Sequence, residues 1–252
     1  PYKPKRRSRA EIARQLGLEP LASILMMQRE PNPEATAKRF VKGEVKSAED
    51  ALKGARDIIA EQVSENEQSR NNVRNAFGRD AVLTSKVVKT KEAEAAKYRD
   101  YFDWQEPLKR CSSHRLLAIR RGEAEGVLKV AITPNDEVCL ERLERQYVRG
   151  RNESSKQIEM AVNDSYKRLL KPSIESEYAN MSKEKADEEA IKNVVAKTVE
   201  KFGKINTLVN NAQVSKSGMP LVEHTKEDFD LAIYSGLYAA FFYMRECYPY
   251  LK

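Results

Sequence analysis

Apolar side chains recur at three- and four-residue steps along most of this chain, and this spacing limits the folds that the chain can adopt. The pattern is clearest over residues 51–63 and returns over residues 140–147, 158–169 and 191–199. It places the apolar side chains on one face of a helix. Only the short segments 81–88 and 126–132 have the β-branched or alternating character of strands. The sequence therefore predicts a mainly α-helical fold.

Charge and aromatic content divide the chain into two compartments. Residues 1–190 carry 37 basic and 32 acidic side chains, whereas residues 191–252 carry 8 and 6, which together give the formal net charge of +7. Nine of the nineteen aromatic residues lie in the last 62 positions. Since one even composition would not give this division, we expect one domain over residues 1–190 and another over residues 191–252.

Several classes of protein are disfavoured by what the sequence lacks. No stretch approaches the roughly 18 consecutive apolar residues of a membrane span, and residues 1–30 lack the pattern of a signal peptide. Cys111, Cys139, Cys247, His114 and His224 share no metal-ligand spacing, and three cysteines do not suggest a disulfide framework. We therefore expect a reduced, soluble, cytoplasmic protein with no metal site and no membrane partner.

The first compartment resembles the Tex-type bacterial transcription accessory proteins. The resemblance is carried by KYRDYFDWQEPLKRCSSHRLLAIRRGEAEGVLKV at residues 97–130, and by YKPKRRSRAEIARQLGLEPLA at 2–22 and DSYKRLLKPSIESE at 164–177. It implies a nucleic-acid-binding protein that acts in transcription, and it identifies residues 1–190 as the N-terminal and central helical region of that family. The ribonuclease-H-like, helix-hairpin-helix and S1 domains of the family would lie outside this sequence.

Two groups of basic side chains are candidates for contact with RNA or DNA, because cations that neutralise phosphates release counterions. The first group lies in a short arm and consists of Lys3, Lys5, Arg6, Arg7 and Arg9. The second consists of Lys109, Arg110, Arg115, Arg120 and Arg121. The alternatives are a solvated arm and ordinary surface charges, some of which would pair with Glu123 and Glu125.

Four aromatic residues near the second group, Tyr98, Tyr101, Phe102 and Trp104, could stack on the bases of a single strand. Aromatic residues at helical spacing are more often part of a core, and we expect this for Tyr98 and Phe102.

The second compartment predicts a short α/β fragment. An apolar strand is expected within KINTLVNNA at residues 204–212, and Thr225 with Asp228 would cap a helix over residues 226–248. VEKFGKINTLVNNAQVSKSGMPL and EDFDLAIYSGLYAAFFYMRECYPYLK resemble the middle of a short-chain dehydrogenase/reductase, most closely the bacterial hydroxysteroid (bile-acid) dehydrogenases. The resemblance implies that Asn210, Asn211 and Ala212 correspond to a turn beside the nicotinamide cofactor.

The same segment departs from the dehydrogenase pattern at the positions that matter for chemistry. Gln213 replaces the glycine of the NNAG-type turn, and Gly236 stands where many members carry a catalytic asparagine. The Gly-rich TGxxxGxG turn that admits the cofactor pyrophosphate is absent. Tyr248 and Lys252 match YxxxK only by coincidence, since they come too early in the family order. We therefore expect no catalytic residues and no cofactor, and Asn210, Asn211 and Ala212 are vestigial.

The two resemblances meet in the string ADEEAIK at residues 186–192, which suits either family. This predicts a chimera joined between about residues 185 and 195. The leading functional hypothesis is a nucleic-acid-binding fragment without catalytic activity. The alternatives are a nicotinamide-dependent oxidoreductase fragment, expected to be inactive, and a non-functional fusion or helical interaction scaffold. The resemblance also implies the transcription machinery as a partner, and the C-terminal fragment could self-associate.

Overall fold

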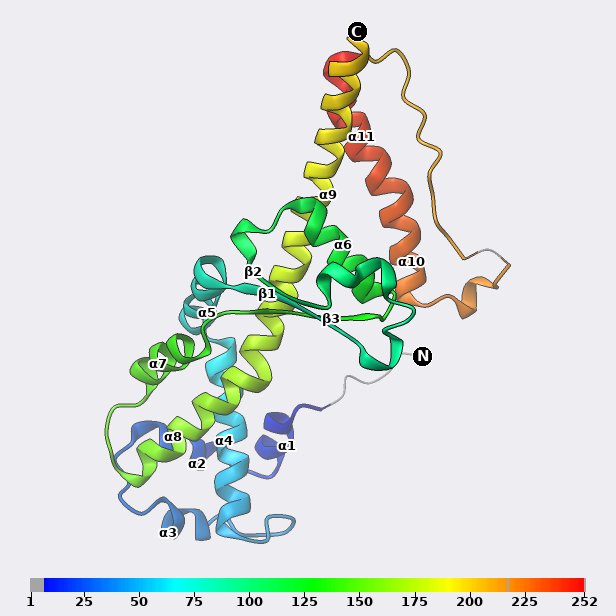
Figure 1. Cartoon of the computed structure of the whole chain (residues 1–252). Coiled ribbons are helices and arrows are strands. Elements are labelled where there is room, and N and C mark those ends of the chain that lie inside the picture. Colours follow the sequence, from blue (N-terminus) through cyan, green and yellow to red (C-terminus); the bar gives the residue numbers. More distant parts are fainter. Residues whose placement is uncertain (1–6, 217, 252) are drawn as a thin grey trace. The chain divides into compact units, whose positions relative to one another are not determined.

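The computed structural model describes residues 7–216 and 218–251, and these form two compact units. Unit 1 contains the described residues up to Cys111 together with Glu125–Asn180, and unit 2 contains Ser112–Ala124 and the described residues from Met181 onward. The fold is mainly α-helical, as the sequence predicts (Figure 1). The predicted domain boundary near residue 190 remains a prediction.

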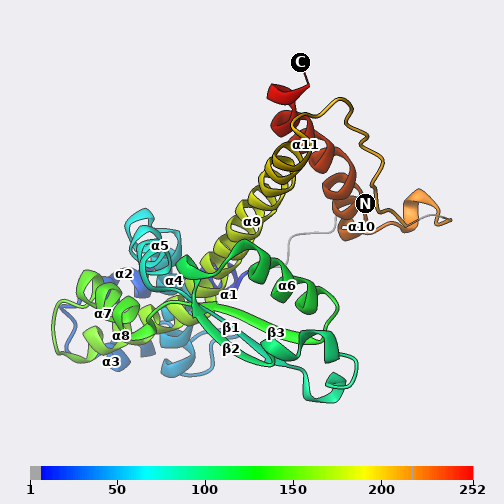
Figure 2. The same ribbon diagram turned by 45° about the horizontal axis from the view of Figure 1, so that its top comes forward.

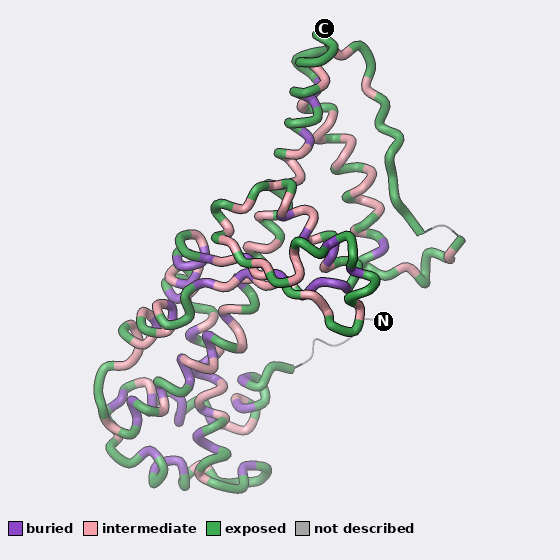
Figure 3. The backbone as a smooth tube through the Cα atoms, viewed as in Figure 1, coloured by how far each residue is buried: buried purple, intermediate pink, exposed green. Residues whose placement is uncertain are grey.

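Unit 1 is built around helix α4 (Ala48–Glu65). The predicted apolar face is confirmed, because Ala51, Ala55, Ile58, Ile59 and Val63 are all fully buried. This face contacts the three preceding helices and α8. Figure 3 shows buried stretches along α4 and its neighbours. The bounds of these neighbours are α1 (Arg9–Gln15), α2 (Glu19–Met27), α3 (Pro33–Lys38) and α8 (Glu153–Asp164).

Gly54 allows the chain to approach α4 closely. A β-carbon at this position would lie 2.3 Å from Cδ1 of Leu18, a residue that is almost completely buried. The absence of a side chain at Gly54 therefore sets the distance between α4 and the segment that joins α1 to α2.

The chain continues from α8 through a π-helical turn, Ser165–Leu170, into the long helix α9 (Lys171–Phe202). The sequence pattern predicts an interruption at Pro172, but the helix passes through it. A proline ring in a regular helix would meet the carbonyl of the residue four positions earlier, here Arg168. Arg168 lies within the π-helical turn, whose wider hydrogen-bonding pattern differs from that of an α-helix.

Unit 1 also contains a small antiparallel sheet, with its strands in the order β2–β1–β3 (Figure 2). The strands predicted within residues 81–88 and 126–132 are confirmed as β1 (Val82–Val87) and β3 (Leu128–Thr133), and β3 extends one residue beyond the predicted end. The sequence does not predict β2 (Asp103–Pro107), which pairs with β1 from Val82–Pro107 to Lys86–Asp103. The segment before β2 forms 3₁₀ turns, Lys89–Lys91 and Ala96–Tyr101, instead of the regular helix that its spacing suggests.

Two further helices belong to unit 1. Helix α5 (Glu67–Asp80) precedes β1, and α7 (Asp136–Tyr147) follows β3. Each begins at an asparagine whose side-chain oxygen accepts a backbone N–H three residues later, at 3.0 Å for Asn66 and 3.1 Å for Asn135. These side chains satisfy donors that the first turn of a helix leaves unpaired.

Unit 2 consists of α6 (Ser113–Ala124), the later part of α9, and a C-terminal helical segment. The predicted helix over residues 226–248 is confirmed as α10 (Lys226–Ala232), a π-helical turn (Ile233–Tyr238) and α11 (Ala239–Cys247). The ammonium of Lys183 lies 5.9 Å from the ring centre of Tyr234.

The strand predicted within residues 204–212 is wrong, because this segment has no regular secondary structure. A β-strand needs a neighbouring strand to pair its backbone N–H and C=O groups. Unit 2 has no described strand, and the segment therefore runs as coil. The C-terminal part of the chain is helical instead of α/β.

None of the described helices combines the length and apolar character that crossing a membrane requires.

Replacing Gly54 by alanine is expected to destabilise unit 1. The added methyl group must displace the buried Leu18 side chain, and overpacking of this kind costs about 1–3 kcal/mol. This loss should exceed the gain of about 0.5–1 kcal/mol that alanine usually brings to a helix interior. Urea unfolding would measure the change, with Gln62→Ala, an exposed position on the same helix, as the control. An increase in stability for Gly54→Ala would contradict this account of the packing.

A pH-dependent change is expected at the start of α10. Lys216 donates to the Asp228 carboxylate at 2.7 Å and the Thr225 backbone N–H donates to it at 3.1 Å, and these bonds lower the pKa of Asp228 to about 2. Since the folded-state pKa is depressed, the capping contribution is complete above about pH 4, the ordinary range of an aspartate, and is lost as the pH falls through about 2. The amide chemical shift of Thr225 should therefore titrate with a midpoint near 2.

Asp228→Asn should abolish this titration while keeping an acceptor for the Thr225 N–H. A midpoint near 4 in the unmodified chain would show that the bonds to Asp228 do not persist in solution.

Candidate nucleic-acid interface

The basic arm leads directly into α1. Ser8 caps this helix by accepting the Glu11 N–H at 3.0 Å. Arg7 and Arg9 are exposed, and the Arg7 guanidinium donates to Gln15 at 3.1 Å. Neither arginine forms an ion pair with another described residue. The other members of the first group, Lys3, Lys5 and Arg6, lie outside the described residues.

Lys109 and Arg110 lie in a 3₁₀ turn, Leu108–Arg110, directly after β2. The turn is anchored by the Leu108 N–H, which donates to the carbonyl of Ala81 at 2.8 Å. Both cationic side chains are exposed, and within the described part of the chain neither one has an ion-pair partner. Arg110 is therefore free to contact an anion, whereas Lys109 also acts electrostatically on the carboxylate of Asp80.

The other three members of the second group lie on α6, in unit 2. Arg120 forms an ion pair with Glu123 at 2.5 Å, as the sequence suggests for part of this group. Arg121 is exposed and Arg115 is half-buried. Each unit therefore contains only part of the second group, and the five cations do not form one cluster within either unit.

The aromatic residues between these groups belong to a small core. Tyr98 is buried with Ala95, Val127 and Leu128, and Phe102 packs against them, as expected. The rings of Tyr101 and Trp104 meet edge to face, with centroids 6.0 Å apart. Both are half-buried, so these rings pack against protein and do not form an open platform for bases.

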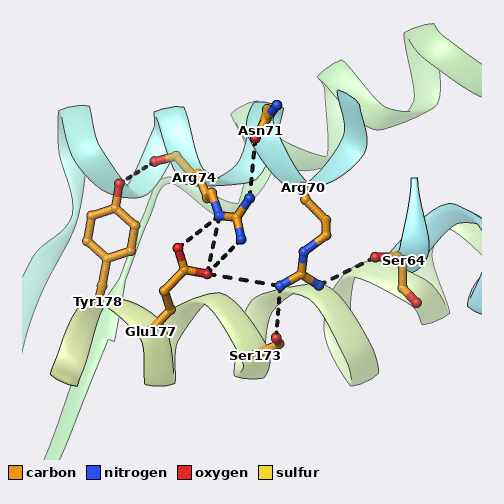
Figure 4. A network of polar contacts seen from close by, with 7 residues as sticks. All are labelled: Ser64, Arg70, Asn71, Arg74, Ser173, Glu177 and Tyr178. Atoms are coloured by element: carbon orange, nitrogen blue, oxygen red, sulfur yellow. Dashed lines mark hydrogen bonds and ion pairs between the residues drawn. The ribbon is translucent and has the colours of Figure 1, made fainter. Parts of the chain in front are cut away.

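Two other arginines of unit 1, Arg70 and Arg74, are already paired with a carboxylate of the protein (Figure 4). Arg74 on α5 donates to both carboxylate oxygens of Glu177 on α9, at 2.9 and 3.0 Å. Arg70 approaches the same carboxylate at 4.0 Å and donates to Ser173 at 3.2 Å. The hydroxyl of Tyr178 donates to the carbonyl of Arg74 at 2.8 Å. This network joins α5 to α9, and its arginines are committed to that contact.

The titratable groups in the interior of unit 1 are also structural. The Tyr166 hydroxyl donates to Asp136 at 2.6 Å, and Lys171 donates to the other oxygen of that carboxylate at 2.7 Å. Burial raises the pKa of Tyr166 and of the neighbouring Cys139 thiol. Both residues are almost fully enclosed and could not reach a ligand. Among the described residues, no group of three or more His, Cys, Asp and Glu side chains could hold a metal ion.

Asn210, Asn211 and Ala212 lie in the coil of unit 2. They line one side of an open hollow of about 620 Å³, and residues of the α10–α11 segment line the other. The Ser235 hydroxyl contacts this coil by accepting the Val214 N–H at 2.9 Å. Its single proton is shared between the carbonyls of Leu231 and Val214, at 2.7 and 2.9 Å. A β-carbon at Gly236 would lie 3.1 Å from the side chain of Gln213, which fills the space beside that glycine.

Comparison with known proteins confirms both resemblances. Residues 28–194 match the Tex central region-like family, and residues 157–252 match the family described as enoyl-(acyl carrier protein) reductase. A 12alpha-hydroxysteroid dehydrogenase of Clostridium sp. is 62% identical over 65 residues, which cover 26% of this chain and 25% of that protein. The two family matches overlap over residues 157–194, and the predicted junction at about residues 185–195 lies at the end of this overlap, within α9.

The Tex-like relatives match a larger share of the chain. The uncharacterized protein YdcI of Bacillus subtilis is 38% identical over 196 residues, which cover 76% of this chain and 27% of the relative. The transcriptional accessory protein Tex of Neisseria gonorrhoeae is 36% identical over 197 residues, which cover 76% and 26%. The chain spans about a quarter of the length of these curated relatives. Since the family match extends over more than half of the sequence, the chain belongs to the Tex central region-like family.

Proposed function

We propose that this chain binds RNA or DNA through exposed basic side chains. The observation that carries the proposal is that Arg7, Arg9, Lys109 and Arg110 are exposed and have no ion-pair partner among the described residues. Cations of this kind can neutralise backbone phosphates without first breaking a salt bridge. Binding of this kind is electrostatic, independent of sequence and weakened by salt.

The family supports the same proposal. One relative is named a transcriptional accessory protein, and another, from Pongo abelii, is named an S1 RNA-binding domain-containing protein. We extend this to the chain as a proposed association with RNA or DNA in the cytoplasm, alongside the transcription machinery.

We also propose that the chain has no catalytic activity of its own. Gln213 occupies the space beside Gly236, and the sequence has neither the Gly-rich phosphate turn nor a YxxxK pair in the family order. The competing proposal, a nicotinamide-dependent oxidoreductase, would need Asn210, Asn211 and Ala212 to support a cofactor without these parts.

Self-association is the remaining proposed partner interaction, and it would arise from unit 2. Six apolar side chains of its C-terminal segment are exposed and follow alternating three- and four-residue steps, a spacing that favours contact between helices. They are Tyr234, Leu237, Phe241, Met244, Tyr248 and Leu251. The third candidate function, a non-functional fusion or helical interaction scaffold, would bind neither nucleic acid nor cofactor.

The chain is expected to bind both single-stranded RNA and duplex DNA at low salt. Fluorescence anisotropy at about 50 and 200 mM salt should show a clear loss of affinity at the higher concentration, because released counterions drive the binding. The titrations should use protein concentrations at which sedimentation shows a single species. Lys109→Gln with Arg110→Gln should weaken binding to both nucleic acids.

The matched control for that pair is Lys38→Gln with Lys97→Gln. It removes the same charge from cations that are already paired with Glu34 and Glu125, at 3.6 and 2.9 Å. It should change the affinity less. Absence of binding at low salt would exclude the proposed function.

NADH fluorescence is expected to remain unchanged when the chain is added. Without the Gly-rich turn, no backbone cradle admits the cofactor pyrophosphate. A saturable change in NADH emission that Gln213→Gly strengthens would instead support the oxidoreductase proposal.

A further inference from the structure

Gln28 joins two loops that are 121 residues apart in the sequence. Its side-chain amide donates to the carbonyl of Tyr147 at 2.7 Å and accepts the N–H of Arg149 at 2.9 Å. Its own carbonyl accepts a hydrogen bond from the Asn152 side chain at 2.8 Å. These bonds hold the loop after α2 against the loop between α7 and α8 (Figure 1).

The backbone of Gln28 shows that this contact is not incidental. Gln28 has a φ of 53° and is the one residue other than glycine with a positive φ in the described part of the chain. The position ends α2, where glycine is the usual residue because it adopts this conformation without steric cost. Glycine would lack the amide that reaches Tyr147 and Arg149. Gln28 therefore adopts a left-handed backbone conformation, which is strained for a residue other than glycine, at the position where its side chain connects the two loops.

Buried serines reinforce the same contact. The Ser154 hydroxyl donates to the carbonyl of Glu30 at 2.7 Å, and Asn152 accepts from both the N–H and the hydroxyl of Ser155, at 2.8 and 2.9 Å. Gln28, Ser154 and Ser155 are all buried. A buried polar network whose members are satisfied makes the surrounding backbone rigid. We call this group, Gln28, Asn152, Ser154 and Ser155, the glutamine clasp.

The glutamine clasp presents three arginines to solvent. Arg29 follows Gln28 directly, and Arg149 and Arg151 flank Gly150 in the facing loop. All three side chains are exposed, and none forms a hydrogen bond or ion pair with another described residue. The neighbouring carboxylates have partners other than these arginines. Glu30 accepts the Asn32 N–H at 3.0 Å, and Glu153, the first residue of α8, pairs with Lys156 at 2.5 Å.

We propose that Arg29, Arg149 and Arg151 form a binding site for the phosphodiester backbone of a nucleic acid. The guanidinium group suits phosphate because its planar fork can donate two parallel hydrogen bonds. The three guanidinium groups lie on two loops that the glutamine clasp holds in place, so binding costs less backbone freedom than it would for loops without such bonds. The site rests on the proposed function and adds a surface that the sequence-predicted basic groups do not include.

The test compares two triple variants of the full chain with equal charge. Arg29→Gln, Arg149→Gln and Arg151→Gln remove the site, whereas Arg39→Gln, Lys42→Gln and Lys46→Gln remove three exposed cations from another loop. Binding to a short oligouridylate is measured across a salt series. Each neutralised phosphate of a single strand contributes about 0.7 to the slope of log Kobs against log salt, so loss of three contacts should lower the slope by about 2.

The expected result is that the site variant loses affinity at low salt and shows this smaller slope. Between about 50 and 200 mM salt, its affinity should then fall about twentyfold less than that of the unmodified chain. The control triple should retain most of the original slope. If the unmodified chain binds and the site variant has the same affinity and slope, the inference is wrong while the proposed function stands. If the unmodified chain does not bind at all, both fail.

Gln28→Gly tests the clasp separately from the charges. It keeps all three arginines and permits the backbone conformation of residue 28, but it removes the bonds to Tyr147 and Arg149. Its affinity should lie between those of the unmodified chain and the site variant. An affinity equal to that of the unmodified chain would show that the clasp does not position the arginines.

Discussion

The apolar face of α4 is enclosed by helices from two distant parts of the chain, and the location of the surface loops in unit 1 follows from this enclosure. Helices α1, α2 and α3 precede α4, whereas α8 arrives about 90 residues after it, and α2 and α8 also contact each other. Once α2 and α8 pack on the same helix, the end of one and the start of the other come together. The glutamine clasp forms at that meeting point, and burial of apolar surface on α4 is what brings its two loops into reach.

Local pattern was sufficient for some elements and not for others. The spacing of Ile58, Ile59 and Val63 identifies α4, because a long helix with one apolar face leaves a periodic record in the sequence. Strand β2 has no such pattern, because apolar and polar residues do not alternate in DWQEP. It forms because its backbone pairs with β1. The opposite holds for residues 204–212, where the composition suits a strand but no strand of unit 2 is present among the described residues. Strands depend on partners that local sequence does not report.

The candidate binding surface shows the same division. A sequence lists cations but does not tell which of them are neutralised in the fold. Arg74 and Arg110 cannot be told apart from the sequence. In the fold, Arg74 pairs with Glu177, which lies 103 residues later in the chain, whereas Arg110 has no ion-pair partner among the described residues. The sequence does not distinguish Arg29 and Arg149 from other surface arginines, because only the folded chain places their loops side by side. The formal charge of +7 is therefore a poor measure of which part of the surface could attract phosphate.

The predicted junction between the two resemblances, at about residues 185–195, lies inside α9, and this helix is continuous across it. Residues 186–192 contain two alanines, two glutamates and one lysine, residues that favour helices whichever family supplies them. The helix therefore continues across a change of family, and the effect of the junction appears only beyond it. There the dehydrogenase-like segment lacks the strands that would pair with residues 204–212 and cover the helix that follows. Residues 204–212 run as coil, and apolar side chains of the helical segment that follows are exposed. A helix forms its backbone hydrogen bonds within itself, whereas a strand needs a partner, so the helical segment can form where the strand does not.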